Sequence, residues 1–205
     1  MIEEKISMHD FVESFVKGLE TRDVYTSGHS IRVAHLGCLI AEKLKLNKKI
    51  INNIHIAGHL HDIGKIGISD EVLNKKGKLT KQEYELLKSH SEKGYNIVKN
   101  IPQLEKISKI ILYHHEWYNG NGYPDKISGA DIPVESRIIS VCDAFDAMTS
   151  DRSYRKALPL EIAMEELISG KGSQFDPLII EAFLEILRNE YKIVSEIMRG
   201  KDSVA

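Results

Sequence analysis

Hydrophobic residues recur with the period of a helix through almost the whole chain, and this pattern constrains the fold more than any other feature. Ile31, Leu36, Leu39 and Ile40 show this spacing along one segment. No alternating run is long enough to predict a sheet. We expect helices over residues 6–19, 29–46, 49–62, 80–89, 92–99, 103–116, 133–149, 159–169 and from 177 onward. The pattern therefore predicts an all-α fold, a single-domain helical bundle.

Local polar and proline signals mark where several of these helices begin. Asn47 suits the N-cap of the third helix, and Thr80 with Glu83 forms a capping box. Pro177 suits the first position of the last helix. Residues 67–78 lack helical periodicity, and we expect them to form a loop.

The composition indicates a globular protein with no broad surface for polyanions. Of 205 residues, 42% are hydrophobic and 28% are charged, and 28 Lys and Arg face 30 Asp and Glu. General binding to a nucleic acid polymer is therefore not expected, and an anionic ligand must be held locally. Cys38 and Cys142 stand apart without a CxxC spacing, and neither a signal-peptide core nor a membrane-spanning run is present. We expect a reduced, cytoplasmic protein that does not bind a membrane.

The pair His61-Asp62 is the strongest candidate for metal binding. It ends an apolar helix, where two adjacent hydrophilic residues need a reason to be present. An imidazole and a carboxylate side by side can reach one metal ion, or two if the carboxylate bridges. Lys65 follows three residues later and can direct a cation toward a bound phosphate. The alternative is a helix end with a basic residue near the negative end of the helix dipole.

Further candidate ligands lie in three other places. His114 and His115 end a helix, and Asp143 and Asp146 lie one turn apart in an apolar helix. Buried carboxylates are costly unless they are paired or coordinated, so at least one of the two is expected to bind a metal. His29 and His90 lie beside small polar residues at helix ends, where a capping role is the alternative. The remaining histidines are interpreted as structural: His9, His35, His55 and His59.

Several motifs, taken together and in order, resemble the HD-GYP subgroup of the HD phosphohydrolase superfamily. They extend from about Asp23 to Leu187. The motifs are GHSIRVA (28–34), HDIGKIGI (61–68), SHSEKG (89–94), HHE (114–116), GYP (122–124), DAFDAMTSDRSYR (143–155) and QFDP (174–177). The resemblance implies a helical bundle of the HD-domain type over residues 23–190, preceded by a helical segment (1–22) and followed by a helix end and tail (191–205).

The resemblance also implies a metal centre and a substrate pocket. Some members hold a third ion with a glutamate, but this chain has Tyr25 at that position. Two divalent transition-metal ions, iron or manganese, are therefore expected. Asp62 would bridge the ions, and Lys65 would orient or protonate at the scissile phosphate. The implied metal ligands are His29, His61, Asp62, His90, His114, His115 and Asp143. The expected substrate-binding residues are Gly122, Tyr123, Pro124, Asp146, Arg152 and Arg155.

The implied activity is hydrolysis of cyclic di-GMP to the linear dinucleotide pGpG, with GMP as a further product, by a water that the two metal ions activate. The alternatives are a non-catalytic cyclic di-GMP sensor that binds proteins and an HD-type nucleotidase. Signalling proteins at the GYP loop and a second copy of the chain are further expected partners. Two residues depart from the usual pattern and concern ligand affinity, namely Trp117 and Asn119.

Overall fold

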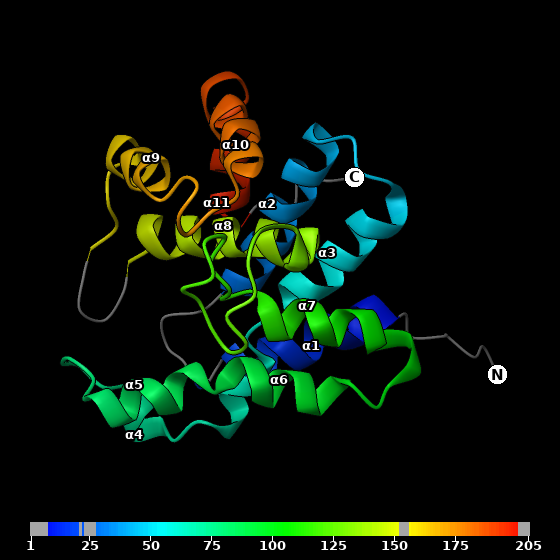
Figure 1. The fold of residues 1–205 in the computed structure, drawn as a ribbon, viewed down its shortest axis with the longest axis vertical. Coiled ribbons are helices and arrows are strands. Elements are labelled where there is room, and N and C mark those ends of the chain that lie inside the picture. The colour runs from blue at the N-terminus through cyan, green and yellow to red at the C-terminus, as the bar shows by residue number, and fades with distance from the viewer. Residues whose placement is uncertain (1–7, 21, 23–27, 152–155, 201–205) are drawn as a thin grey trace.

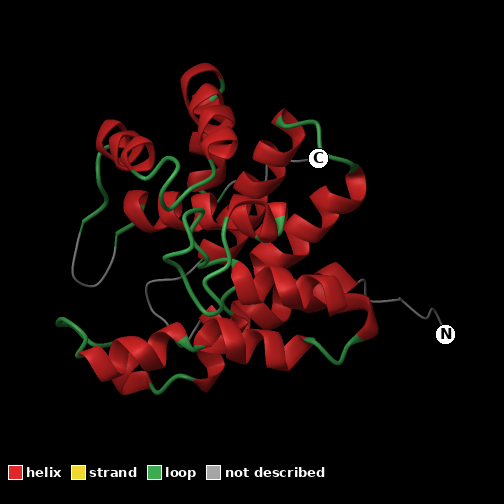
Figure 2. Ribbon diagram, in the orientation of Figure 1, coloured by secondary structure: helices red, strands yellow, loops and turns green. Residues whose placement is uncertain are grey.

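The apolar stripes of the sequence form helices throughout the described part of the chain. The computed structural model describes residues 8–20, 22, 28–151 and 156–200. These residues form no strand, and an isolated bridge joins Lys171 to Phe175 (Figure 2). The helices are α1 (Met8–Glu20), α2 (His29–Lys43), α3 (Lys48–Leu60), α4 (Asp70–Leu73), α5 (Lys81–Lys88), α6 (His90–Val98), α7 (Glu105–Tyr113), α8 (Val134–Thr149), α9 (Leu160–Ser169), α10 (Pro177–Asn189) and α11 (Tyr191–Met198). Three 3-10 turns join them: η1 (Ile63–Gly67), η2 (Pro102–Leu104) and η3 (Gly129–Asp131).

Helices α2, α3 and α8 form the centre of the bundle (Figure 1). Helices α2 and α3 approach closely because Gly58 faces Ala34, where an added Cβ would lie 2.6 Å from the Ala34 Cα. Phe145 of α8 and Phe183 of α10 are buried and meet edge to face, with ring centroids 4.9 Å apart. This dense core holds the central helices in fixed positions relative to one another.

The first and last described helices pack on the same core. Val12 and Val16 of α1 are buried in it, and so are Val194 and Ile197 of α11. The division of the chain at residues 23 and 190 stays a prediction. None of the described helices is long and apolar enough to cross a membrane.

Several predicted helix boundaries agree with the structure. The Asn47 side chain caps α3 by accepting a hydrogen bond from the Ile50 amide at 3.0 Å. The capping box of Thr80 and Glu83 begins α5. Helices α8 and α9 end at Thr149 and Ser169, as the sequence predicts.

Other boundaries were predicted wrongly. Residues 67–78 contain a short helix, α4, because Val72 turns into the protein and is buried. The helix predicted to reach residue 116 ends at Tyr113, since the backbone carbonyl of His115 accepts a hydrogen bond from the Tyr123 amide instead. Helix α10 is not the last helix, because the backbone at Glu190 leaves helical angles before α11 begins.

Helices α4 and α5 extend from the bundle as an arm, which comprises residues 69–89 (Figure 1). None of the α5 residues is buried. Such a helix depends on local hydrogen bonds and ion pairs more than on core packing. Lys75 and Glu83 form one such ion pair at 2.6 Å.

Candidate metal centre and its cavity

The predicted metal ligands come together from the ends of four helices and the middle of a fifth. His29 begins α2 and His90 begins α6, whereas His61-Asp62 follows α3 and His114-His115 follows α7. Asp143 lies within α8. Gly64 lets η1 rest against the start of α6, because an added Cβ would lie 1.9 Å from the carbonyl oxygen of His90. Distant parts of the sequence thus meet at one site.

One group of three ligands comprises His29, His61 and Asp143, whose ligand atoms all lie within 4.8 Å of one another. The Nε2 atoms of His29 and His61 are 3.2 Å apart. The Nε2 atom of His29 is also 3.3 Å from Oδ1 of Asp143. Two imidazoles and a carboxylate pointing at a common position are a suitable set for a divalent transition metal.

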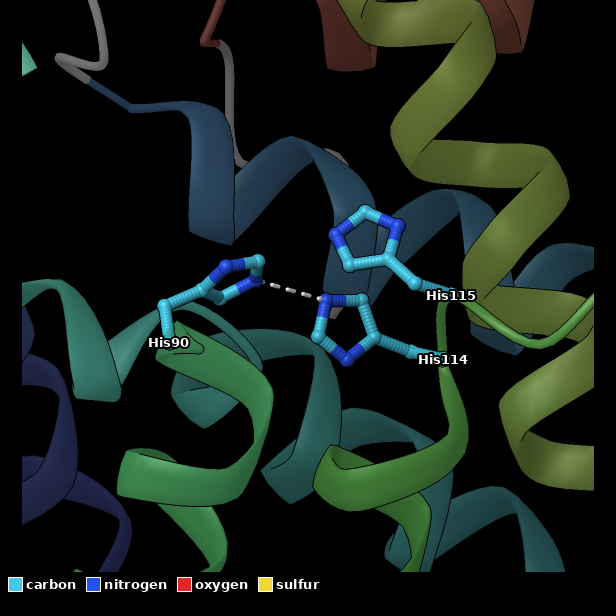
Figure 3. A group of neighbouring side chains, drawn as sticks. All are labelled: His90, His114 and His115. Atoms are coloured by element: carbon cyan, nitrogen blue, oxygen red, sulfur yellow. Dashed lines mark hydrogen bonds between the residues drawn. The ribbon is translucent and has the colours of Figure 1, made fainter. Parts of the chain in front are cut away.

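A second group comprises His90, His114 and His115, and Figure 3 shows the three imidazoles facing one another. The Nε2 atoms of His90 and His114 are 3.3 Å apart. The ring centroids of His90 and His115 are 5.0 Å apart. This group supplies three nitrogen donors and no carboxylate of its own.

Asp62 lies between the two groups. Its Oδ2 is 3.4 Å from Nε2 of His61 and 3.7 Å from Nε2 of His29, in the first group. Its Oδ1 faces the second group, 3.6 Å from Nε2 of His90. One carboxylate oxygen is therefore directed at each group, which is the arrangement a bridging ligand requires.

Backbone hydrogen bonds determine which ring nitrogen of three histidines is free to bind a cation. The Nδ1 atoms of His61, His90 and His114 donate to the carbonyl oxygens three residues earlier, at 2.8, 2.7 and 2.6 Å. Each Nε2 then presents a lone pair to the centre. Lone pairs so close together repel one another unless a cation lies between them. The donor set therefore fits metal ions.

The electrostatics of the second group favour neutral imidazoles. Burial, reinforced by the neighbouring histidines, holds the pKa of His114 well below its usual value. Burial and His90 lower the pKa of His115 to about 3. Metal ions bind neutral imidazole, so these nitrogens are ready to act as ligands near neutral pH.

The carboxylates of the centre favour positive charge. Burial opposes ionisation of Asp62, yet Lys65 and the surrounding histidines hold its pKa well below the usual value. Burial likewise opposes a charge on His29, but hydrogen bonds to Asp143 and Asp146 raise its pKa to about 9. The same negative charges that stabilise a proton on His29 would stabilise a metal cation.

Asp146 has a different position from the substrate-binding one that the sequence suggested. Its side chain is fully buried, and Oδ2 lies 2.6 Å from Nδ1 of His29. Arg32 donates to both carboxylate oxygens, at 2.5 and 3.1 Å. Both oxygens are engaged and Asp146 does not line the cavity, so the residue is placed where it can orient the His29 imidazole, and its contact with a substrate stays a prediction.

The GYP loop folds onto the segment that follows α7. Glu116 is buried and its Oε1 accepts hydrogen bonds from the amides of Asp125 and Lys126, at 2.7 and 2.8 Å. Gly122 packs so tightly that an added Cβ would lie 2.2 Å from the Trp117 amide nitrogen. Tyr123 then stacks on His115, with ring centroids 4.9 Å apart.

A cavity of about 990 Å³ opens beside the metal centre. Of the predicted substrate residues, Tyr123 lines it, whereas Gly122 and Pro124 do not. Arg152 and Arg155 lie outside the described residues. The lining residues are His29, Asp62, Lys65, Val72, Leu73, Lys75, Lys76, Gly77, Lys78, Leu79, Tyr84, Leu87, Lys88, His90, His115, Tyr123, Asp143 and Ala147.

The arm supplies cavity residues that the motifs did not indicate. Lys75 and Lys78 lie in the loop between α4 and α5, and Tyr84 and Lys88 lie on α5. The only sequence signal was the high density of lysine after the HD pair. Lys65 lies at the inner end, 2.7 Å from Oδ2 of Asp62, where the sequence predicted a cation.

The histidines interpreted as structural do not join either group of ligands. His35 stacks on His55 with ring centroids 5.9 Å apart, and His55 meets His59 at 4.8 Å. His59 is buried. Their placement agrees with the structural interpretation, while the side chain of His9 lies outside the described part of the protein.

Comparison with known proteins points to one family. Residues 14–179 match the HD domain family. The chain is 40% identical over 185 residues to a cyclic di-GMP phosphodiesterase of Thermotoga maritima, covering 89% of this chain and 50% of that protein. It is 40% identical over 170 residues to the cyclic di-GMP phosphodiesterase response regulator RpfG of Xanthomonas campestris pv. campestris, covering 82% and 45%. A 3'3'-cGAMP-specific phosphodiesterase of Vibrio cholerae is 35% identical over 187 residues, covering 90% and 36%.

Solved structures agree on the fold. An HD-GYP protein of Bdellovibrio bacteriovorus aligns with a TM-score of 0.67 at 19% identity, covering 88% of this chain and 61% of that one. The HD domain of the L. monocytogenes phosphodiesterase PgpH in complex with cyclic-di-AMP aligns with a TM-score of 0.58 at 22% identity, covering 87% and 97%. The chain spans half or less of the length of the three curated relatives named above. It therefore belongs to the HD domain family, and its ordered motifs are those of the HD-GYP subgroup.

Proposed function

We propose that this chain is a metal-dependent phosphodiesterase that hydrolyses cyclic di-GMP. The observation that carries the proposal is the pair of ligand groups with Asp62 directed at both, beside a cavity of about 990 Å³. Relatives at 40% identity are cyclic di-GMP phosphodiesterases, which supports the same substrate class here. A cavity of this size suits a ligand of two nucleotides.

The donor set supports two ions of iron or manganese. It combines imidazole and carboxylate without any thiolate, and such sets suit these metals. His29, His61 and Asp143 would hold one ion, His90, His114 and His115 the other, and Asp62 both. When bound, such ions supply a lowered pKa for water and positive charge beside the non-bridging oxygens of a phosphodiester.

Lys65 and two arginines complete the proposed machinery. The Lys65 ammonium lies beside Asp62 at the edge of the cavity, from where it would orient the scissile phosphate or protonate the leaving oxygen. Arg152 and Arg155 would grip phosphate, since they are three residues apart and can face one side of a helical turn. Hydrolysis of one ester would give pGpG, and hydrolysis of the second would give GMP.

A second substrate is favoured by a specific observation. Some of the relatives are 3'3'-cGAMP-specific phosphodiesterases, at 33–35% identity. Cyclic di-GMP and 3'3'-cGAMP share the ring of two phosphodiesters and differ in one purine. We propose cyclic di-GMP as the preferred substrate because the relatives with 40% identity act on it. Protein partners at the GYP loop, a homodimer and a cytoplasmic location stay predictions.

The proposal is tested with the full chain purified without oxygen and loaded with iron or manganese. We expect about two ions per chain by elemental analysis, and conversion of cyclic di-GMP to pGpG by chromatography. Parallel assays with 3'3'-cGAMP and GMP measure substrate preference. Binding without turnover would identify a sensor, and turnover of mononucleotides alone would identify a nucleotidase, so either result overturns the proposal.

A further inference from the structure

The outer part of the cavity carries aromatic and cationic side chains in contact, at a distance from the metal ligands. Tyr84 is 51% exposed and lines the cavity from α5. Lys88 lies on the same helix one turn later. Its Nζ is 5.4 Å from the centroid of the Tyr84 ring and 5.2 Å from that of Tyr123.

These side chains continue a series of rings that begins at the metal centre. The His90 and His115 ring centroids are 5.0 Å apart, and those of His115 and Tyr123 are 4.9 Å apart. Lys88 then lies between Tyr123 and Tyr84. Tyr84 is thus the outermost ring of a track that leads from the second group of ligands to the arm.

A cyclic dinucleotide requires features of this kind beyond the metal ions. When one phosphodiester reaches the centre, the other phosphate and at least one purine must occupy the remaining cavity. A purine presents a flat face that stacks on an aromatic ring. The second phosphate carries a negative charge that a lysine can offset.

The positive charge of the arm can offset the charge of the second phosphate. Lys75 and Lys88 have acidic partners, Glu83 and Glu85, at 2.6 and 2.8 Å. Lys76 and Lys78 are exposed at the cavity, and neither forms an ion pair with any described residue. The arm therefore adds net positive charge to the outer part of the cavity.

We propose that Tyr84 and Lys88 of α5 form a nucleobase subsite for the half of the cyclic dinucleotide that is not being cleaved. The Tyr84 ring stacks on the purine, and the Lys88 ammonium, held between Tyr84 and Tyr123, faces its phosphate. The inference rests on the proposed function for the class of ligand. Replacing these two residues should weaken substrate binding and leave the metal content unchanged, whereas replacing a metal ligand should lower the metal content.

The test compares three replacements of Tyr84 in the full, metal-loaded chain. Tyr84→Ala and Tyr84→Leu both remove the aromatic face, but leucine retains apolar bulk and helix propensity. Each should raise the KM for cyclic di-GMP and its Kd by roughly 10- to 100-fold. Tyr84→Phe retains the ring and should stay within about threefold of wild type. Lys88→Met should raise the KM less than Tyr84→Ala does.

Two controls separate this subsite from the metal centre. Inorganic phosphate has no base, so its inhibition constant should not change in any Tyr84 variant, and neither should metal content. Tyr191→Ala alters a tyrosine of similar exposure, 47%, on α11 away from the cavity, and should leave the KM unchanged.

The outcomes distinguish failure of the subsite from failure of the proposed function. Unchanged KM and Kd in Tyr84→Ala and Tyr84→Leu, with wild-type turnover present, overturn the subsite alone. Wild-type binding that depends on Tyr84 but leads to no hydrolysis overturns the phosphodiesterase and supports the subsite. A wild-type chain that binds neither cyclic di-GMP nor 3'3'-cGAMP overturns both. Equal losses in Tyr84→Leu and Tyr84→Phe overturn stacking, because only one of them lacks the ring.

Discussion

The metal centre and the arm line the same cavity but are held in place by different forces. The centre is built on helices that pack in the core, and its candidate ligand His61 is fully buried. The arm contributes α5, none of whose residues is buried. Chemistry that needs fixed ligand positions is thus built on the rigid part. The proposed recognition of the dinucleotide uses a part held mainly by local interactions.

The largest effect is expected when Asp62 is replaced by alanine. Its two oxygens face different ligand groups, so the change should weaken both metal positions and abolish turnover. Metal content should fall from about two ions toward none, while far-UV circular dichroism stays helical. Elemental analysis and the cyclic di-GMP assay check this result.

Asp131→Ala provides a matched control, because Asp131 is an exposed aspartate of η3 that does not line the cavity. It should keep metal and activity. If an Asp62→Ala variant retains two ions and wild-type turnover, Asp62 is not a metal ligand.

Replacement of Lys65 should affect turnover more than binding. The Lys65 Nζ lies 2.7 Å from Asp62 and is not a metal ligand. If it protonates the leaving oxygen, Lys65→Ala should lower kcat by about 10²–10⁴-fold with both ions retained. Lys65→Arg restores the charge but transfers a proton poorly, so it should recover part of the rate. Near wild-type kcat in Lys65→Ala, with metal content confirmed, would leave Lys65 as a residue that only neutralises Asp62.

The contrast between the two regions also explains what the sequence could predict. The candidate metal ligands were predictable because most of the motifs place reactive side chains at a helix end, as with His61-Asp62 after α3, and because Asp143 is a carboxylate within an apolar helix. The role of Asp146 was not, since its contact with His29 joins residues 117 positions apart and depends on how α2 packs on α8. Helix α4 was missed because four residues are too few to show a period. Tyr84 carried no signal and the arm lysines showed only their density, because exposed residues look alike in a sequence whether or not a ligand contacts them.

Asp146→Asn should produce a smaller effect that is confined to one ligand group. The amide keeps the shape of the carboxylate but cannot balance the charge that develops on His29. Such supporting residues typically change metal affinity or activity by about 10–100-fold. Metal titration should therefore show one weakened ion, in the group with His61 and Asp143, and one unchanged ion. Asp131→Asn is the control, and equal weakening of both ions would contradict the assignment of Asp146 to His29.

The smallest effect is expected in the arm, when Thr80 is replaced by alanine. The Thr80 hydroxyl accepts a hydrogen bond from the Glu83 amide at 3.3 Å, and the Glu83 carboxylate accepts one from the Thr80 amide at 2.7 Å. Losing such a cap costs about 1 kcal/mol, here from a helix without buried residues. Amide hydrogen exchange in α5 should therefore accelerate by roughly fivefold. Metal content and the free energy of global unfolding should stay unchanged. A loss of metal in Thr80→Ala would mean that the arm and the metal centre unfold as one cooperative unit. The distinction between the rigid centre and the locally stabilised arm would then be wrong.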